Sequence, residues 1–166
     1  MNRNILQAAA IAALCAACQS EGTAQPEARD GRPFAVTEVA DFSSPWAMAF
    51  LPGSGVPLTN MALLTEKEGK LWLVDVTNGK RTAVAGVPEV VSAGQGGLGD
   101  VMPHPDFAGN RRVYLSYVEG GANGTSGAVL GYGTLDLSDA AAPALRDFNV
   151  IWRQQPKVSG NGHFSH

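Results

Sequence analysis

Two stretches of this sequence share one order of short β-strands and turns, repeated at a period of about fifty residues. The repeat aligns Leu51-Pro52 with His104-Pro105, and Leu63-Leu64 with Tyr114-Leu115. A unit of four short strands at this period is typical of one blade of a β-propeller. The sequence therefore predicts an all-β chain that holds about two such blades, with strands from Phe34 onward.

Each expected strand is a short apolar run, rich in β-formers and bounded by turn residues. Asn78-Gly79 gives the strongest hairpin signal. No helix is expected beyond the N-terminal segment, because no window keeps an apolar stripe at three-to-four spacing for three turns. The expected strands are 47–51, 62–65, 71–74, 82–84, 98–102, 113–117, 128–135 and 149–152.

A propeller ring usually needs about four to eight blades before it closes. The sequence holds about two, and the residues from Lys157 resemble the start of a third. A partial ring would leave a sheet edge open. We therefore expect the chain to be the N-terminal portion of a longer propeller that is inactive alone.

The N-terminus resembles a bacterial export signal. Arg3 supplies a positive charge, and the apolar stretch from Ile5 to Ala17 is too short to span a bilayer. Residues 14–18 resemble a lipobox, in which Cys18 would be lipidated; the alternative is an ordinary cleaved signal peptide. We expect a signal peptide with lipobox at 1–17, a flexible tether at 18–32 and a partial propeller domain at 33–166. The protein would then be exported to the periplasm and lipid-anchored to the outer membrane.

Charge and cysteine content narrow the possible partners. The net charge is −3 and no run of like charges occurs, so nucleic acid is not an expected partner. Both cysteines, Cys15 and Cys18, lie in the N-terminal segment. The domain should therefore contain no disulfide and no thiolate metal site.

Three residues are candidates for chemistry. Gln95 lies in a glycine-rich stretch where the backbone can approach a ligand, although an ordinary turn role is the alternative. His163 follows Gly160-Asn161-Gly162 at the expected start of an inner strand, where a base or a capping role would both fit. His104 lies between two prolines, which favours a structural role.

Several motifs in this order resemble the glucose/sorbosone dehydrogenase family, the soluble aldose dehydrogenases that use pyrroloquinoline quinone (PQQ). The resemblance covers essentially the whole expected domain, although no Arg-Leu follows His163-Phe164 as the family pattern would have it. Its motifs are Ser44-Pro45-Trp46-Ala47-Met48-Ala49-Phe50-Leu51-Pro52, Leu64-Thr65-Glu66-Lys67-Glu68-Gly69-Lys70-Leu71-Trp72, Gly86-Val87-Pro88, Gly94-Gln95-Gly96-Gly97-Leu98-Gly99-Asp100-Val101, His104-Pro105-Asp106-Phe107, Asn110-Arg111, Val113-Tyr114-Leu115-Ser116-Tyr117 and Gly162-His163-Phe164.

The resemblance implies a six-bladed propeller and an oxidoreductase that converts the anomeric hydroxyl of aldoses to the lactone. It implies PQQ and calcium as cofactors and an external electron acceptor. His163 would be the general base, and Gln95 would line the sugar and quinone pocket. Most cofactor-binding residues would lie beyond the last residue given. The alternatives are a non-redox propeller similar to a sugar lactonase, and a non-enzymatic lipid-anchored binding fragment.

Overall fold

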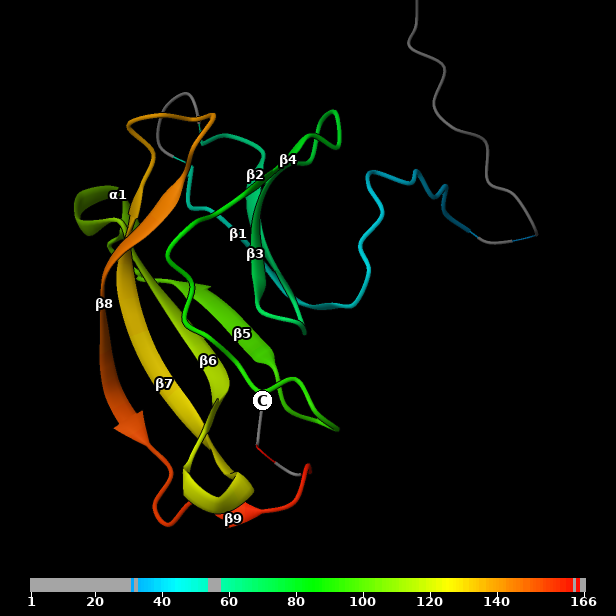
Figure 1. Ribbon diagram of the computed structural model, residues 1–166. Coiled ribbons are helices and arrows are strands. Elements are labelled where there is room, and N and C mark those ends of the chain that lie inside the picture. Colours follow the sequence, from blue (N-terminus) through cyan, green and yellow to red (C-terminus); the bar gives the residue numbers. More distant parts are fainter. Residues whose placement is uncertain (1–30, 32, 54–57, 163, 165–166) are drawn as a thin grey trace, which may run out of the picture. The chain divides into compact units, whose positions relative to one another are not determined.

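The strands form two antiparallel sheets, each built as a meander in chain order (Figure 1). The computed structural model describes residues 31, 33–53, 58–162 and 164, and contacts group Glu38–His166 into one unit. The first sheet holds β1 (Pro45–Phe50), β2 (Met61–Glu66), β3 (Lys70–Asp75) and β4 (Arg81–Ala83). The second holds β5 (Leu98–Pro103), β6 (Arg112–Gly120), β7 (Thr125–Asp136) and β8 (Ala144–Arg153), with β9 (Val158–Ser159) paired to β7.

All eight strands expected from the sequence are present, and the all-β prediction is confirmed. The first strand begins at Pro45, later than the expected start near Phe34. Two short helical turns and β9 were not expected. The helical turns are α1 (Phe107–Asn110) and the 3-10 turn η1 (Ala122–Gly124). Each is too short to show an apolar stripe in the sequence.

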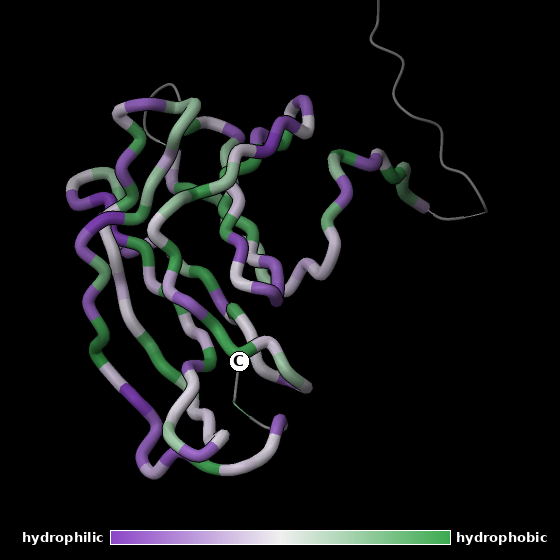
Figure 2. Tube along the Cα trace, in the orientation of Figure 1, coloured by the Kyte–Doolittle hydropathy of each residue, from purple (hydrophilic) through white to green (hydrophobic). Residues whose placement is uncertain are grey.

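Turn chemistry explains why the meander forms. The β3–β4 turn is closed by a 2.8 Å hydrogen bond from the Gly79 N–H to the carbonyl of Asp75, and Gly79 has φ +72°. Glycine adopts this left-handed conformation without a Cβ clash, as the Asn-Gly signal predicts. Figure 2 shows hydrophilic residues at this turn.

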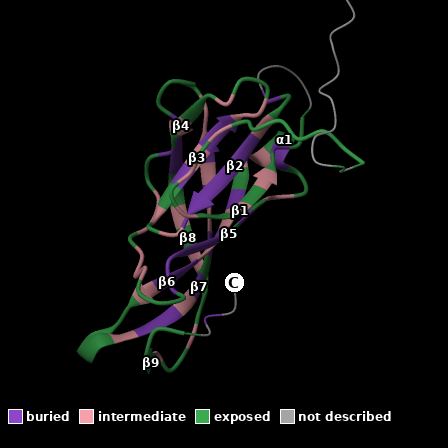
Figure 3. Ribbon diagram, turned by 90° about the vertical axis from the view of Figure 1, so that its right-hand side faces the viewer, coloured by how far each residue is buried: buried purple, intermediate pink, exposed green. Residues whose placement is uncertain are grey.

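One hydrophobic core lies between the two sheets. Leu63 and Leu71 are almost fully buried from the first sheet, and Leu98 and Leu115 from the second. Burying a side chain of this size stabilises the fold by roughly 1.5–3 kcal/mol. Figure 3 shows β2 as mostly buried, while β1 has exposed residues.

Hydrogen bonds join the sheets directly at several places. The Thr65 hydroxyl on β2 donates to the carbonyl of Gly99 on β5 at 2.8 Å. Ala85, just after β4, forms a parallel bridge with Ala144 at the start of β8. The Leu145 N–H donates to the carbonyl of Ala85 at 2.7 Å. The relative position of the sheets is therefore fixed by backbone groups as well as by the core. Across the described ranges, no helix is both long and apolar enough to cross a membrane.

Candidate functional site

The candidate site is built around residues 94–97, here called the glycine loop, which leads into β5. Gln95 lies in this loop and is exposed. The loop is a turn that runs directly into a strand, as the sequence predicted. Its contacts come from three sides: the β2–β3 turn, the end of β6, and the segment that precedes His163.

The β2–β3 turn holds the glycine loop through Lys67. The N–H of Leu98 donates to the carbonyl of Lys67 at 3.0 Å, and the Lys67 ammonium donates to the carbonyl of Gly94. Gly97 has φ +129°, and a Cβ there would lie 2.3 Å from the Lys67 carbonyl oxygen. Only glycine allows this close approach of the two chains.

The other two contacts come from the second sheet. The N–H of Val118 on β6 donates to the carbonyl of Gly97 at 2.9 Å. The N–H of Gln95 donates to the carbonyl of Asn161 at 2.7 Å. A Cβ at Gly94, whose φ is +59°, would lie 2.2 Å from that same Asn161 oxygen. The glycine loop is therefore fixed against a segment far away in the sequence.

The Gln95 side chain lies beside the residue that precedes His163. A Cβ placed on Gly162 would lie 3.5 Å from the Gln95 Oε1 atom. An exposed amide at this position can both donate and accept hydrogen bonds. His163 lies outside the residues that the structure describes, so its role as a base stays a prediction, as does the ligand role of Gln95. Cys18 also lies outside the described residues.

A charged cluster lies next to this site at the turn between β6 and β7. The Arg153 Nε atom lies 2.8 Å from the Glu119 Oε1 atom, and the Lys157 Nζ atom lies 2.9 Å from it. Burial by itself raises the pKa of this carboxyl, but hydrogen bonds and positive charge from Lys157 and Arg153 outweigh burial and lower the pKa of Glu119. Glu119 is therefore held as a carboxylate.

Sequence reasoning missed Glu119 and the Asn161 carbonyl as parts of this arrangement. The partners of Glu119, Arg153 and Lys157, lie on a distant segment of the sequence. No short spacing in the sequence therefore indicates these ion pairs. The Asn161 contact uses a backbone carbonyl, which leaves no trace in residue type. The only sequence signal was the glycine content of residues 94–97, since close backbone approach requires glycine.

His104 lies at the opposite end of the second sheet and is engaged in local contacts. Its Nδ1 atom accepts the N–H of Asp106 at 2.9 Å and lies 2.9 Å from the Asn110 Nδ2 atom. Its ring stacks on Tyr114 with centroids 6.0 Å apart. These contacts agree with the structural role expected from the sequence.

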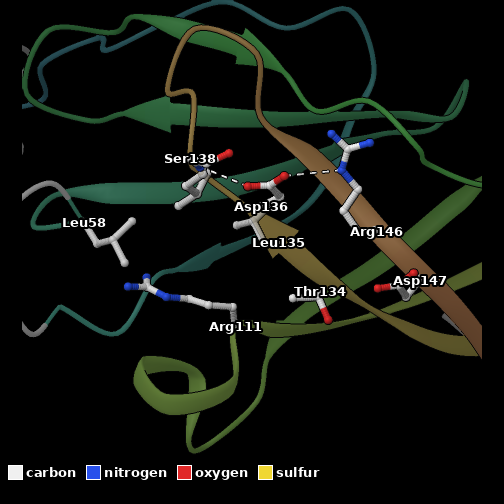
Figure 4. Close-up of a pocket in the computed structure, with 9 residues that line it drawn as sticks. Leu58, Arg111, Thr134, Leu135, Asp136, Ser138, Arg146 and Asp147 are labelled. Carbon is white, nitrogen blue, oxygen red and sulfur yellow. Dashed lines mark hydrogen bonds and ion pairs between the residues drawn. The ribbon is translucent and has the colours of Figure 1, made fainter.

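A cavity of about 540 Å³ lies at that same far end, and Gln95 does not line it (Figure 4). Arg111 and Arg146 line it together with the end of β7. The Asp136 carboxylate accepts the Ser138 N–H at 3.0 Å and the Arg146 Nε–H at 3.4 Å. Val118, which binds the glycine loop, pairs with Ala128 on β7. Thr134, six residues further along β7, lines the cavity, which places the cavity about 20 Å along the strand at about 3.3 Å per residue. Among the described residues, no group of three or more His, Cys, Asp or Glu could hold a metal ion.

Comparison with known proteins identifies the family and relatives that this chain resembles. Residues 42–166 match the family model described as Glucose / Sorbosone dehydrogenase. Aldose sugar dehydrogenase YliI of Escherichia coli is 43% identical over 122 residues, which are 72% of this chain and 30% of that protein.

Solved structures agree with this match. A glucose dehydrogenase crystal structure is 48% identical with a TM-score of 0.63, over 72% of this chain and 32% of that one. The PQQ-bound aldose sugar dehydrogenase of Streptomyces coelicolor is 26% identical with a TM-score of 0.56, over 73% of this chain and 34% of that one. The chain thus spans about a third of the length of each relative.

Proposed function

This chain belongs to the glucose/sorbosone dehydrogenase family, and we propose that it contributes the base-bearing part of a site that oxidises the anomeric hydroxyl of aldoses to the lactone. The proposed electron path runs through PQQ to an external acceptor. The names of the relatives support a sugar substrate. The structural observation that carries the proposal is the hydrogen bond from Gln95 to Asn161, which brings a polar side chain beside the residue preceding His163.

Two residues of this chain have roles in the proposed reaction. The His163 imidazole removes the proton of the anomeric hydroxyl as hydride leaves the anomeric carbon. The Gln95 amide orients a sugar hydroxyl or a quinone carbonyl by hydrogen bonding, since it is exposed and held by a rigid loop. When bound, PQQ would supply the acceptor for the hydride and its two electrons. The protein then supplies position and a base.

The described residues fit one cofactor better than the other. The exposed amide of Gln95, on a glycine-rich backbone, suits a planar ligand that carries carbonyl and carboxylate oxygens. The resemblance also implies calcium, but the described residues offer no cluster of acidic or imidazole side chains for it.

A hybrid enzyme tests the proposal. Residues 42–166 would replace the matching segment of the Escherichia coli aldose sugar dehydrogenase, and oxidation of an aldose would be followed with PQQ and an artificial electron acceptor. We expect PQQ-dependent formation of the lactone, and a loss of about 10²- to 10⁴-fold in turnover in His163→Ala. A folded hybrid that binds PQQ but oxidises no aldose would contradict the proposal.

We also propose that the protein is exported and lipid-anchored at Cys18, with residues 18–32 as a tether to a domain in the periplasm. The support is the order of a positive charge, an apolar stretch and a lipobox-like segment. Cells that express the full chain would be labelled with radioactive palmitate. We expect label in the parent protein and none in Cys18→Ser, while Cys15→Ser serves as the matched control. Label that survives Cys18→Ser would reject the anchor.

A further inference from the structure

Lys157 is held in place more firmly than an ordinary surface lysine. Its ammonium lies 2.9 Å from the Glu119 Oε1 atom and donates to the carbonyl of Gly120 at 2.7 Å. The Lys157 side chain is 18% exposed and that of Glu119 is 21% exposed. An ion pair with this burial is screened less by solvent than a fully exposed pair.

The methylene carbons that form the stem of the Lys157 side chain are closely packed, in addition to the contacts of its ammonium group. A Cβ at Gly121 would lie 2.7 Å from the Lys157 Cδ atom, and one at Gly127 would lie 3.0 Å from its Cγ atom. The stem therefore lies across two glycines on either side of the β6–β7 turn. Position 157 is fixed through both its charge and its methylene groups.

The chain that follows Lys157 runs directly to the glycine loop. Val158 and Ser159 pair with the start of β7 as β9. The Ser126 hydroxyl donates to the carbonyl of Gly160 at 3.4 Å. The next residue, Asn161, accepts the N–H of Gln95 at 2.7 Å. These contacts follow one another along the chain and connect Lys157 to the Asn161 carbonyl without a gap.

We propose that Lys157 is a positioning residue, which acts through its ion pair with Glu119 to hold the Asn161 carbonyl against Gln95. Its importance for sugar oxidation rests on the proposed function of Gln95. Without the ion pair, Lys157 no longer ties this segment to Glu119 on β6, and the hydrogen bond between Gln95 and Asn161 is weakened. Lys157 touches no reacting atom in this role.

Hydrogen exchange of the Gln95 amide tests the inference in the full chain, without PQQ or sugar. Lys157→Met removes the charge and keeps much of the stem, while Glu119→Gln removes the partner charge. We expect the Gln95 amide to exchange roughly threefold to tenfold faster in both variants, in line with the loss of a partly buried ion pair. The Leu98 amide, which donates to Lys67, should keep its exchange rate. Lys157→Arg should restore protection of the Gln95 amide.

The matched control is Arg146→Met, which removes an ion pair with Asp136. This pair joins the last residue of β7 to the start of β8, at the end of the sheet away from the glycine loop. It should leave exchange at Gln95 unchanged. Unchanged exchange at Gln95 in folded Lys157→Met or Glu119→Gln would overturn the inference, as would an equal effect of Arg146→Met. Because hydrogen exchange is measured without any activity, failure of the proposed sugar oxidation leaves the exchange result intact. In the hybrid enzyme, Lys157→Met should lower kcat more than it changes KM.

Discussion

The backbone N–H of Gln95 donates a 2.7 Å hydrogen bond to the carbonyl of Asn161. This bond joins the loop before β5 to the segment that follows β9, two segments that lie far apart in the sequence. It is the contact that brings the glycine loop beside the residue preceding His163. Gly94, the residue before Gln95, makes this contact possible, because a Cβ there would lie 2.2 Å from the Asn161 carbonyl oxygen.

Gly94→Ala should destabilise the protein more than the same change at Gly124. Both glycines have positive φ, +59° and +71°, so alanine brings similar backbone strain of about 1–2 kcal/mol at each position. Only at Gly94 would the new Cβ clash with the Asn161 oxygen, because nothing lies within 4 Å of a Cβ at Gly124. We expect an additional loss of about 1–3 kcal/mol in the free energy of unfolding, measured by urea denaturation. Equal losses would show that the contact with Asn161 is unimportant.

Thr65→Val should weaken the link between the two sheets. The Thr65 side chain is fully buried; its hydroxyl accepts the Ala47 N–H at 3.0 Å and donates to the Gly99 carbonyl at 2.8 Å. Valine has nearly the same shape but leaves both backbone groups without this partner, at a cost of about 1–3 kcal/mol. The exposed Thr59 provides the control, since Thr59→Val should change the free energy of unfolding by less than about 0.5 kcal/mol. A neutral Thr65→Val would argue against this hydrogen-bonded link.

Glu66 should make the stability of the protein depend on acid pH. It is 2% exposed and accepts the N–H of Ser43 at 2.7 Å. Burial by itself raises the pKa of this carboxyl, but the opposing interactions, among them those with Ser43, Lys70 and Arg81, lower the pKa of Glu66 below its ordinary value. The unfolded chain therefore takes up a proton at higher pH than the folded one. The stability that Glu66 contributes is complete above a pH of about 4.5 and is lost as the pH falls through the folded-state pKa.

Urea denaturation of Glu66→Gln at two pH values checks this sign. At pH near 7 the variant should be less stable than the parent by about 1–2 kcal/mol, because the charged acceptor is gone. Near pH 3.5 the difference should shrink, since the parent's carboxyl is then increasingly protonated. Thr59→Val, at an exposed position and without change of a titratable group, should show no such pH dependence. A difference that stays constant or grows toward low pH would contradict the assignment.

His104 and His163 should respond oppositely to replacement by alanine. His104→Ala removes the acceptor of the Asp106 N–H and the contact with Asn110, and it should lower the free energy of unfolding by about 1–2 kcal/mol. Turnover per folded molecule of the hybrid enzyme should change little. His163→Ala should instead abolish most turnover and leave thermal stability and PQQ binding nearly unchanged. The reverse pattern, with His104→Ala as the inactive variant, would show that the two roles are assigned wrongly.

The strands could be predicted because their signals are local. Alternating apolar residues and turn residues such as Asn78-Gly79 fix where a strand begins and ends, whatever it later packs against. For the same reason β9 was missed, since two exposed residues show no alternation. The propeller-blade pattern and the family motifs are likewise carried by the order of residues along the chain.

The sequence by itself determined the two four-stranded meanders, the repeat and the glycine content of the loop around Gln95. Only the tertiary structure decided that Thr65 bridges the sheets, that Glu119 pairs with Lys157, and that Asn161 holds Gln95. Strand formation depends on side-chain period and turn chemistry within a few residues, which the sequence displays directly. These contacts instead depend on how the two sheets pack and on the register of β6, β7 and β9. Such long-range geometry brings together backbone and charged groups whose spacing in the sequence carries no signal.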